Sequence, residues 1–256
     1  MAAFEFHQFP CRDDNYGVLV HDPASGQTAS IDAPDASAVD AALEQRGWQL
    51  SHILTTHKHA DHVDGNLELK TKYNCVITGP EAEASDIPGI DQTVIHEQRI
   101  EFAEAPVEVI ATPGHTLGQI AYHFPQSRTV FAADAMFALG CGRIFEGTPA
   151  QMWTALSRLA ALPPETVVYA GHEYTMANAK FAMTIEPDNQ ALVERVAHIE
   201  KLRADDLPTL PTTIAAELAT NPFLRPHSAE IRQRLGMVDA TDEQVFTEVR
   251  KRKDNA

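Results

Sequence analysis

Hydrophobic and polar residues alternate in three short stretches near the N-terminus. The alternation covers Phe4–Phe9, Tyr16–His21 and Gln27–Ile31, and it predicts three β-strands, each with one face turned to a core. From Ala36 to Arg46 the pattern becomes alanine-rich and helical, and Gly47 is a suitable residue for ending that helix. The chain is therefore predicted to begin as a sheet followed by a helix.

Short strands and helices continue to alternate as far as about residue 174. A strand over Leu50–Leu54 precedes a polar loop, and a helix then runs to about Tyr73. A second helix is predicted from Thr148-Pro149 to about Leu162, with proline in its first turn. The further predicted strands are Cys75–Thr78, Arg99–Phe102, Val107–Ala111, Gln119–Phe124, Arg128–Ala132 and Thr166–Ala170. This order of elements predicts an α/β domain.

From Thr175 onward the periodicity is helical, and we expect no strand there. The predicted helices are Ala177–Ile185, Gln190–Arg203, Ser228–Leu235 and Thr241–Lys253. The change in pattern predicts two domains, an α/β catalytic domain over residues 1–174 and a smaller helical domain over residues 175–256.

Four side chains that can bind a metal lie within six positions of the loop after Leu54, namely His57, His59, Asp61 and His62. In extended backbone, residues two apart point the same way, so His57 and His59 can reach one ion together. Because the chain then bends into a helix, Asp61 and His62 suit a second ion better. Imidazole nitrogen and carboxylate oxygen favour zinc, iron or manganese over calcium or magnesium.

Three more candidate ligands follow the ends of later strands: His115 after Thr-Pro-Gly, Asp134 after Ala-Ala, and His172 after Ala-Gly. Ligands commonly bind at the carboxyl ends of strands in α/β sheets. With the first loop, these residues provide five imidazoles and two carboxylates. That set exceeds what one ion needs and suits two ions about 3.5–4 Å apart.

The formal net charge of -16 counts against nucleic acid as a partner, because phosphate binding needs a basic surface. In such an acidic chain the basic run Arg250-Lys251-Arg252-Lys253 is unusual. It is either a solvated last helical turn that complements the helix dipole or a local binding site for an anion.

Neither a secretory signal nor an apolar run long enough for a membrane span is visible in the sequence. The three cysteines, Cys11, Cys75 and Cys141, are widely spaced and odd in number, which does not indicate a disulfide framework. We therefore expect a cytoplasmic protein with no membrane partner, and a monomer by default.

The loop Thr56–His62, with the later Gly-His, Asp and Gly-His elements, resembles the metallo-β-lactamase-fold hydrolases. The resemblance implies an αββα sandwich, in which two mixed sheets pack face to face with helices outside. It also implies that Asp32 supports a metal ligand without binding the metal itself, although a helix N-cap would explain that residue equally well. By the same resemblance, the first ion is held by His57, His59 and His115, the second by Asp61, His62 and His172, and Asp134 bridges them.

Within this superfamily the chain is most similar to the glyoxalase II family. The stretches that carry the similarity are Asp14–Tyr16, Gly114–Gly118, Gly140–Gly147, Gly171–Thr175, Asn221–Arg225 and Val249–Asp254. The resemblance implies that glutathione is held by Arg143, Tyr174, Arg250 and Lys253. Phe145 departs from the pattern, since some members have a tyrosine there that also contacts the tripeptide.

The resemblance implies hydrolysis of S-(2-hydroxyacyl)glutathione, chiefly S-D-lactoylglutathione, to glutathione and D-lactate by a metal-bridging hydroxide, which is the second step of methylglyoxal detoxification. Asp61 and Asp134 are the catalytic carboxylates in this interpretation. The sequence leaves open which metal is bound (zinc, iron or manganese), the preferred acyl group, and whether Asp61 is a base as well as a ligand.

The alternative functions are a persulfide dioxygenase with a single iron, a flavin-linked diiron oxidoreductase, a nuclease of the same fold, and a scaffold that has lost its metals. The helical region argues against the first and the net charge against the nuclease. His59 stands where the flavin-linked enzymes have glutamate, which argues against that alternative. All seven ligands of the family pattern are present, which argues against a scaffold that has lost its metals.

Overall fold

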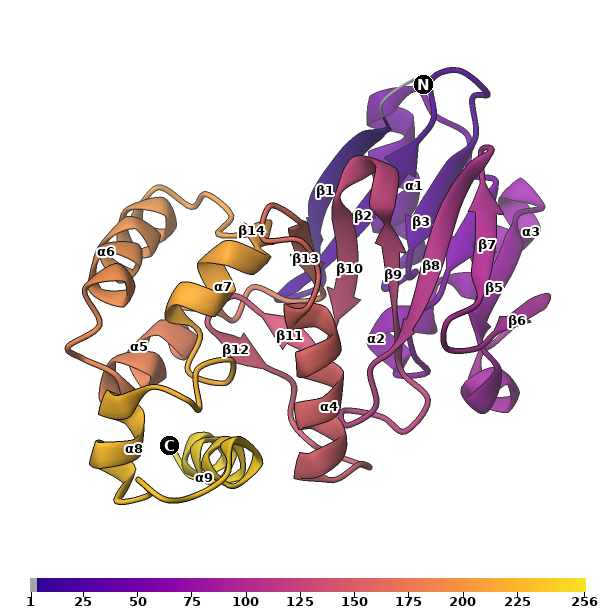
Figure 1. Cartoon of the computed structure of the whole chain (residues 1–256). Helices are drawn as coiled ribbons and strands as arrows, with labels where there is room; N and C mark the ends of the chain where they lie inside the picture. The colour runs from indigo at the N-terminus through magenta and orange to yellow at the C-terminus, as the bar shows by residue number, and fades with distance from the viewer. Residues whose placement is uncertain (1–3) are drawn as a thin grey trace. The chain divides into compact units, whose positions relative to one another are not determined.

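The computed structural model describes residues 4–256 (Figure 1). Residues 1–3, which belong to the N-terminal stretch that we predicted to lack a secretory signal, lie outside the described part. By its internal contacts the chain forms two compact units. One contains the residues up to Ala111 together with Thr116–Phe131, and the other contains Thr112–His115 and Ala132–Ala256.

The first unit contains a six-stranded sheet whose strands follow one another in sequence order (Figure 1). Its strands are β1 (Glu5–Cys11), β2 (Asn15–His21), β3 (Thr28–Ile31), β4 (His52–Leu54), β5 (Val76–Pro80) and β6 (Gln92–Val94). The pairs from β1 to β3 are antiparallel and those from β3 to β6 are parallel. Helices α1 (Ala36–Arg46) and α3 (Asn66–Tyr73) provide the crossovers that parallel strands need. Their apolar residues Val39, Leu43 and Leu69 share a core cluster with Leu19 and Ile53 of the sheet.

A second sheet contains the strands β7 (Arg99–Phe102), β8 (Ala105–Ala111), β9 (Ile120–Phe124) and β10 (Thr129–Ala133) as neighbouring antiparallel partners. It packs on the first sheet through aromatic side chains: the ring of Phe4 lies 5.7 Å from those of Phe102 and Phe124, and the hydroxyl of Tyr122 donates to the carbonyl of Thr55 at 3.0 Å. The two sheets with helices α1 and α3 confirm the predicted sandwich.

The second unit is mainly helical. Its helices are α4 (Pro149–Ala160), α5 (Thr175–Ile185), α6 (Gln190–Ala204), α7 (Ile214–Thr220), α8 (Ala229–Leu235) and α9 (Asp242–Asp254). Helices α4 and α9 both begin with a capping box, and they pack together through the rings of Trp153 and Phe246, 5.7 Å apart. The unit also contains the small hairpin of β11 (Met136–Phe137) and β12 (Gly140–Cys141). Within residues 4–256 no helix has the length and apolar character that crossing a membrane requires.

The structure corrects several details of the sequence prediction. The single helix expected after the polar loop is two helices, α2 (Ala60–Val63) and α3, because the amide of Gly65 donates to the carbonyl of Ala33 instead of continuing the first helix. The prediction of no strand beyond residue 175 was wrong, since β14 (Thr212–Thr213) pairs with β13 (Val167–Ala170). Strand β6, helix α7 and the β11–β12 hairpin were not predicted.

A buried carboxylate, Glu186, connects the helices of the second unit. It is only 2% exposed and accepts hydrogen bonds from Arg225 at 2.7 and 2.9 Å, from Asn189 at 2.9 Å, and from the hydroxyl of Ser228. Burial alone would raise the pKa of Glu186, but these hydrogen bonds outweigh it and lower the pKa below the ordinary value of 4.5.

A Glu186→Gln variant should lower the free energy of unfolding at pH 7 by roughly 1–3 kcal/mol, because the arginine loses a charged acceptor. A carboxyl group with a lowered pKa stabilises the fold at pH values above its unfolded pKa, and this contribution is lost as the pH falls through the folded pKa. The difference between wild type and variant should therefore shrink below pH 4.5. Urea denaturation at pH 7 and at pH 4 measures it, and a difference independent of pH would contradict the assignment.

Candidate metal centre

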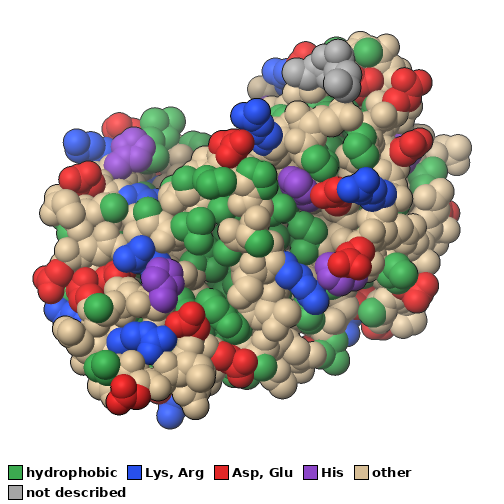
Figure 2. Space-filling model, in the orientation of Figure 1, with side chains coloured by type: hydrophobic (Ala, Val, Ile, Leu, Met, Phe, Trp, Pro, Cys, Tyr) green, Lys and Arg blue, Asp and Glu red, His purple; other side chains and the backbone are tan. Residues whose placement is uncertain are grey.

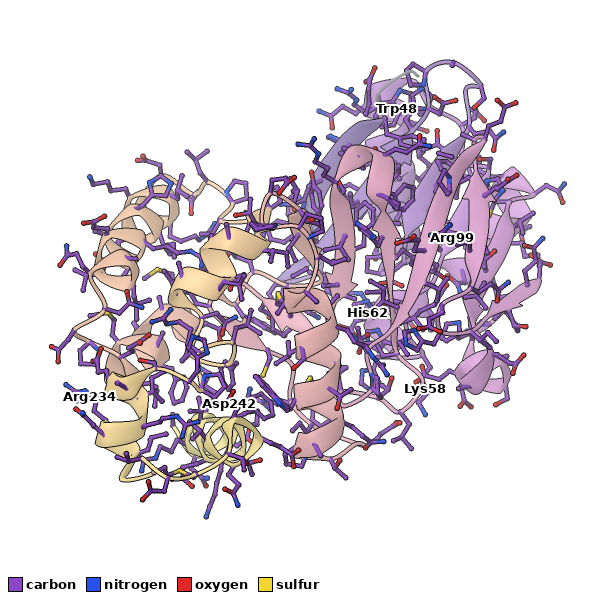
Figure 3. The ribbon with its side chains drawn as sticks, in the orientation of Figure 1. Trp48, Lys58, His62, Arg99, Arg234 and Asp242 are labelled. Carbon is purple, nitrogen blue, oxygen red and sulfur yellow. The ribbon has the colours of Figure 1, made fainter. Side chains whose placement is uncertain are left out.

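The first four candidate ligands lie where β4 ends and α2 begins. Figure 3 shows His62 at the end of the sandwich opposite Trp48. His57 and His59 precede α2, and their Nε2 and Nδ1 atoms are 3.2 Å apart, so their imidazoles face a common space as the i, i+2 spacing predicts. Asp61 and His62 lie on the single turn of α2, with His62 Nε2 3.7 Å from a carboxylate oxygen of Asp61. His57 and His62 are buried, whereas His59 and Asp61 are half-buried.

Asp32 holds this loop from the end of β3. Its carboxylate accepts from the amide of Thr56 at 2.6 Å and from the Thr56 hydroxyl at 2.8 Å, and one of its oxygens is 2.7 Å from Nδ1 of His62. The N-cap of α1 is Asp35, so the N-cap explanation of Asp32 is wrong. Because the carboxylate engages Nδ1, it leaves Nε2 of His62 as the nitrogen for a ligand, which is the usual arrangement around a metal-binding histidine.

Asn15 supports Asp61 in a way that the sequence did not reveal. Its side-chain amide donates to a carboxylate oxygen of Asp61 at 3.1 Å and lies 3.3 Å from the Asp61 carbonyl. The only sequence signal was that Asn15 belongs to the Asp14–Tyr16 stretch of the family resemblance, which assigned it no role. The contact restricts the rotation of a half-buried carboxylate on α2.

The other three candidate ligands lie together in the second unit. Nε2 of His115 and Nε2 of His172 are each 3.4 Å from the same oxygen of Asp134, and all three side chains are buried. Nδ1 of His115 lies 2.9 Å from the carbonyl oxygen of Arg143, to which it can donate, so its Nε2 is directed to Asp134. Asp134 directly follows β10, as predicted, and Ala133 before it has a left-handed φ of 42°. A carboxylate between two imidazole nitrogens is the arrangement expected of a shared metal ligand.

Three of the four predicted glutathione residues form a basic cluster in the second unit, which we define as Arg143, Arg250 and Lys253. Arg250 is buried, at 4% exposure, and donates to the Cys141 carbonyl at 3.1 Å and to Asp254 at 2.7 Å. The interpretation of the basic run as a fully solvated helical turn is therefore wrong for Arg250. Its guanidinium holds the backbone two residues before Arg143.

Lys253 is half-buried, and its Nζ lies 3.1 Å from the carbonyl of Ala177 and 5.2 Å from the ring centre of Phe181. Burial lowers the pKa of Lys253, and the positive charges of Arg250 and Arg143 lower it further. The carboxylate of Asp254 is paired with Arg250 and offsets part of this charge, which leaves the cluster with a net positive charge. The cluster is therefore suited to a carboxylate ligand.

Two aromatic rings accompany the histidines of the second unit. Tyr174 is 37% exposed and stacks on His172 with ring centres 4.7 Å apart, and it makes a T-shaped contact with Phe137 with ring centres 5.2 Å apart. Phe145 is 62% exposed and its ring centre lies 5.1 Å from that of His115. The phenylalanine that departs from the family pattern therefore remains beside a candidate metal ligand, where it offers an apolar contact in place of a hydroxyl.

Buried side chains of α5 and α7 hold the β11–β12 turn that leads to Arg143. Glu217, which is fully buried, accepts from the amide of Leu139 at 2.9 Å, while Asn221 donates to the carbonyl of Gly140 at 3.0 Å and Asn178 to that of Ala138 at 3.1 Å. Asn221 belongs to a stretch that carries the family resemblance, which assigned it no role, and no signal in the sequence marked Glu217 or Asn178.

Two family models match the chain. The metallo-beta-lactamase superfamily matches residues 13–172, and the hydroxyacylglutathione hydrolase C-terminus matches residues 173–256. The hydroxyacylglutathione hydrolase of Brucella anthropi is 60% identical over 250 residues, which are 98% of this chain and 96% of the relative. That of Rhizobium meliloti is 59% identical over 255 residues, covering 100% of both chains.

Solved structures agree on the fold. ETHE1 from Myxococcus xanthus superposes with a TM-score of 0.68 at 25% identity and covers 96% of each chain. The BLEG-1 B3 metallo-beta-lactamase superposes with a TM-score of 0.66 at 19% identity, covering 86% of this chain and 100% of its own.

Proposed function

The chain belongs to the hydroxyacylglutathione hydrolases of the metallo-β-lactamase superfamily, and we propose on that basis which of its residues bind metal, accept the proton of water and bind glutathione. It is an enzyme of the glyoxalase II type, which hydrolyses glutathione thioesters of 2-hydroxy acids such as S-D-lactoylglutathione. The observation that carries this conclusion is identity of about 60% over the full chain, helical region included.

The family and the histidine and aspartate clusters imply a dinuclear metal site. The residues fit such a site, since His62 and His115 each have a carboxylate or carbonyl oxygen at Nδ1, which leaves Nε2 for a ligand. Bound divalent ions lower the pKa of water to about 7 and polarise a carbonyl oxygen. The proposed ligands are His57, His59 and His115 for the first ion, Asp61, His62 and His172 for the second, and Asp134 as the bridge.

Asp61 is proposed to accept the proton of the attacking water. Asn15 fixes its carboxylate, and its half-buried position leaves it open to solvent. The water oxygen bonds to the thioester carbonyl carbon, the bond from carbon to sulfur then breaks, and the electron pair leaves on sulfur. A thiol of this kind has a pKa of about 8.5, so the thiolate leaves without a strong general acid.

Glutathione is proposed to bind at the basic cluster and Tyr174. The tripeptide carries two carboxylates, which offset the repulsion among Arg143, Arg250 and Lys253. Arg250 is buried against Cys141, so its contribution is to position the Arg143 segment, while Lys253 and the exposed Arg143 are available to the ligand. We also propose the functional division into a catalytic region over residues 1–174 and a glutathione-binding helical region over residues 175–256, supported by the extents of the two family models.

Zinc is the proposed metal, with iron and manganese as alternatives, because nitrogen and oxygen ligands suit all three.

A cytoplasmic enzyme is proposed because Cys11, Cys75 and Cys141 are free and buried. Burial raises the pKa of Cys11 to about 12 and that of Cys141 to about 11. We propose a monomer and no nucleic-acid partner. Figure 2 shows lysine and arginine interspersed with acidic side chains, without a continuous basic tract on the visible face.

The function is tested by thiol release from S-D-lactoylglutathione with the zinc-loaded protein. The matched control substrate is the D-lactoyl thioester of N-acetylcysteamine, which keeps the reacting bond but lacks both glutathione carboxylates. We expect rapid hydrolysis of the first and much slower hydrolysis of the second. Failure of the zinc-loaded protein to hydrolyse the glutathione thioester would contradict the proposal.

A further inference from the structure

A buried glutamate outside the proposed ligand set joins two loops of the first unit. Glu83 lies on the short 3₁₀ helix η1 (Glu81–Asp86) and is only 2% exposed. One carboxylate oxygen accepts the amide of Lys58 at 2.8 Å, and the other accepts the amide of Gly118 at 2.8 Å. Both oxygens thus engage main-chain donors that are 25 and 35 positions away in the sequence.

The first of these donors belongs to the metal-binding loop. The amide of Lys58 is part of the planar peptide that joins His57 to Lys58, so holding this N–H restricts the rotation of that peptide. The imidazoles of His57 and His59 leave the backbone on either side of it, and their facing nitrogens are 3.2 Å apart. A second contact ties Lys58 to the same 3₁₀ helix, since its Nζ lies 3.8 Å from a carboxylate oxygen of Asp86. Figure 3 marks Lys58 at the same end of the sandwich as His62.

The second donor explains why residue 118 is glycine. A Cβ atom there would lie 2.5 Å from Cγ of Glu83 and 2.9 Å from the Cβ of Ala82, closer than real Cβ contacts come. Only a residue without a side chain lets the carboxylate reach this amide. Gly118 ends the Gly114–Gly118 stretch, three positions after His115 in the chain.

A carboxylate suits this position better than the isosteric amide. Two N–H donors require two acceptor oxygens, and a glutamine would provide only one, with an NH₂ group facing the other donor. A buried donor without an acceptor is unfavourable, so one of the two loops would have to move. Nothing in the local sequence around Glu83 marks this role, because both partners are reached only in the folded chain.

We propose that Glu83 is a positioning residue of the metal centre, which holds the His57-Lys58-His59 loop and the Gly118 end of the following loop at fixed orientation. It touches neither substrate nor metal. The inference rests on the proposed placement of the first ion on His57 and His59. Residues that orient metal ligands typically contribute a factor of about 10–100 to metal affinity.

The test compares Glu83→Gln with Glu81→Gln, which makes the same chemical change at an exposed position of the same 3₁₀ helix. Zinc affinity of each metal-free protein is measured by competition with a chromophoric chelator, and the urea stability of each metal-free protein is measured in parallel. We expect Glu83→Gln to bind its most weakly held zinc about 10–100-fold less tightly than wild type. Glu81→Gln should match wild type.

Equal zinc affinities of the two variants would overturn the inference, even if Glu83→Gln were less stable when metal-free, since a purely structural role would change stability alone. A wild type that binds no zinc would instead contradict the proposed metal centre. If Glu83→Gln does not fold, Gly118→Ala displaces the carboxylate from the other side and should weaken zinc binding in the same range. Wild-type affinity in that variant would also overturn the inference.

Discussion

Asp134→Asn should reduce bound zinc from two equivalents to one or fewer and lower kcat/KM by roughly a hundredfold to a thousandfold. The physical reason is that one oxygen of Asp134 lies 3.4 Å from the Nε2 atoms of both His115 and His172. In the proposed site a carboxylate there would serve both ions, and an amide neither carries its charge nor offers two equivalent oxygens. Losing one of two ions removes several kcal/mol of transition-state stabilisation.

The matched control is Asp239→Asn, an exposed aspartate in the turn before α9. Zinc content is determined by elemental analysis after reconstitution and dialysis, alongside kcat and KM for S-D-lactoylglutathione. Chelation of wild type should abolish hydrolysis, and zinc should restore it. Full zinc content with wild-type turnover in Asp134→Asn would exclude this residue as the bridging ligand.

Elements with strong local signals were predicted closely. Helix α1 was expected over Ala36–Arg46, and the structure has these bounds because Asp35 caps its N-terminus and Gly47 ends it with a φ of 69°. Strand β7 was also predicted at its observed bounds, Arg99–Phe102. In these cases capping, turn chemistry and periodicity all act within a few residues, so one sequence suffices.

The missed elements depend on partners far away in the chain. Strand β14 has two residues, Thr212 and Thr213, and exists only because it pairs with Val167 and Val168 of β13. Strand β6 likewise has three residues and is defined by its parallel pairing with β5. No periodicity can be recognised in two or three residues, so the sequence alone could not reveal them.

In the candidate site, too, local features were predictable from the sequence and long-range contacts were not. The i, i+2 spacing of His57 and His59 predicted that both imidazoles can reach one ion. Their Nε2 and Nδ1 atoms lie 3.2 Å apart, and the shared ion itself stays a prediction. The roles inferred for Asn15 and Glu83 were not predictable, because each contacts a segment more than twenty positions away. The burial of Arg250 against Cys141 was not foreseen for a related reason, because it depends on the packing of α9 and not on the basic run itself; its role toward glutathione stays a prediction.

Lys253→Met should raise KM for S-D-lactoylglutathione about tenfold to a hundredfold and change kcat much less. One charged hydrogen bond contributes roughly 1–3 kcal/mol to binding, which converts to this range of affinity. The methionine removes the ammonium group that lies 5.2 Å from the ring centre of Phe181 but keeps the apolar stem of the side chain, so folding should be preserved. Because the glutathione carboxylates are remote from the reacting carbonyl, the contact stabilises ground state and transition state alike.

Lys251→Met is the matched control, since it removes the same charge from an exposed position of the same helix. If the cluster attracts glutathione only by its overall charge, both variants should show the same increase in KM. If Lys253 makes a specific contact, only Lys253→Met should show it. Ionic strength provides a further test: raising it should increase the KM of wild type more than the KM of Lys253→Met, because the variant has already lost the screened interaction.

The lowered pKa of Lys253 provides a second test, since an anion that offsets the charges of Arg250 and Arg143 should raise that pKa again. Binding of the unreactive thioether S-hexylglutathione should therefore take up protons at alkaline pH in wild type and less in Lys253→Met, which calorimetry in buffers of different ionisation enthalpy measures. An unchanged KM in a fully metal-loaded Lys253→Met enzyme would remove Lys253 from the glutathione site.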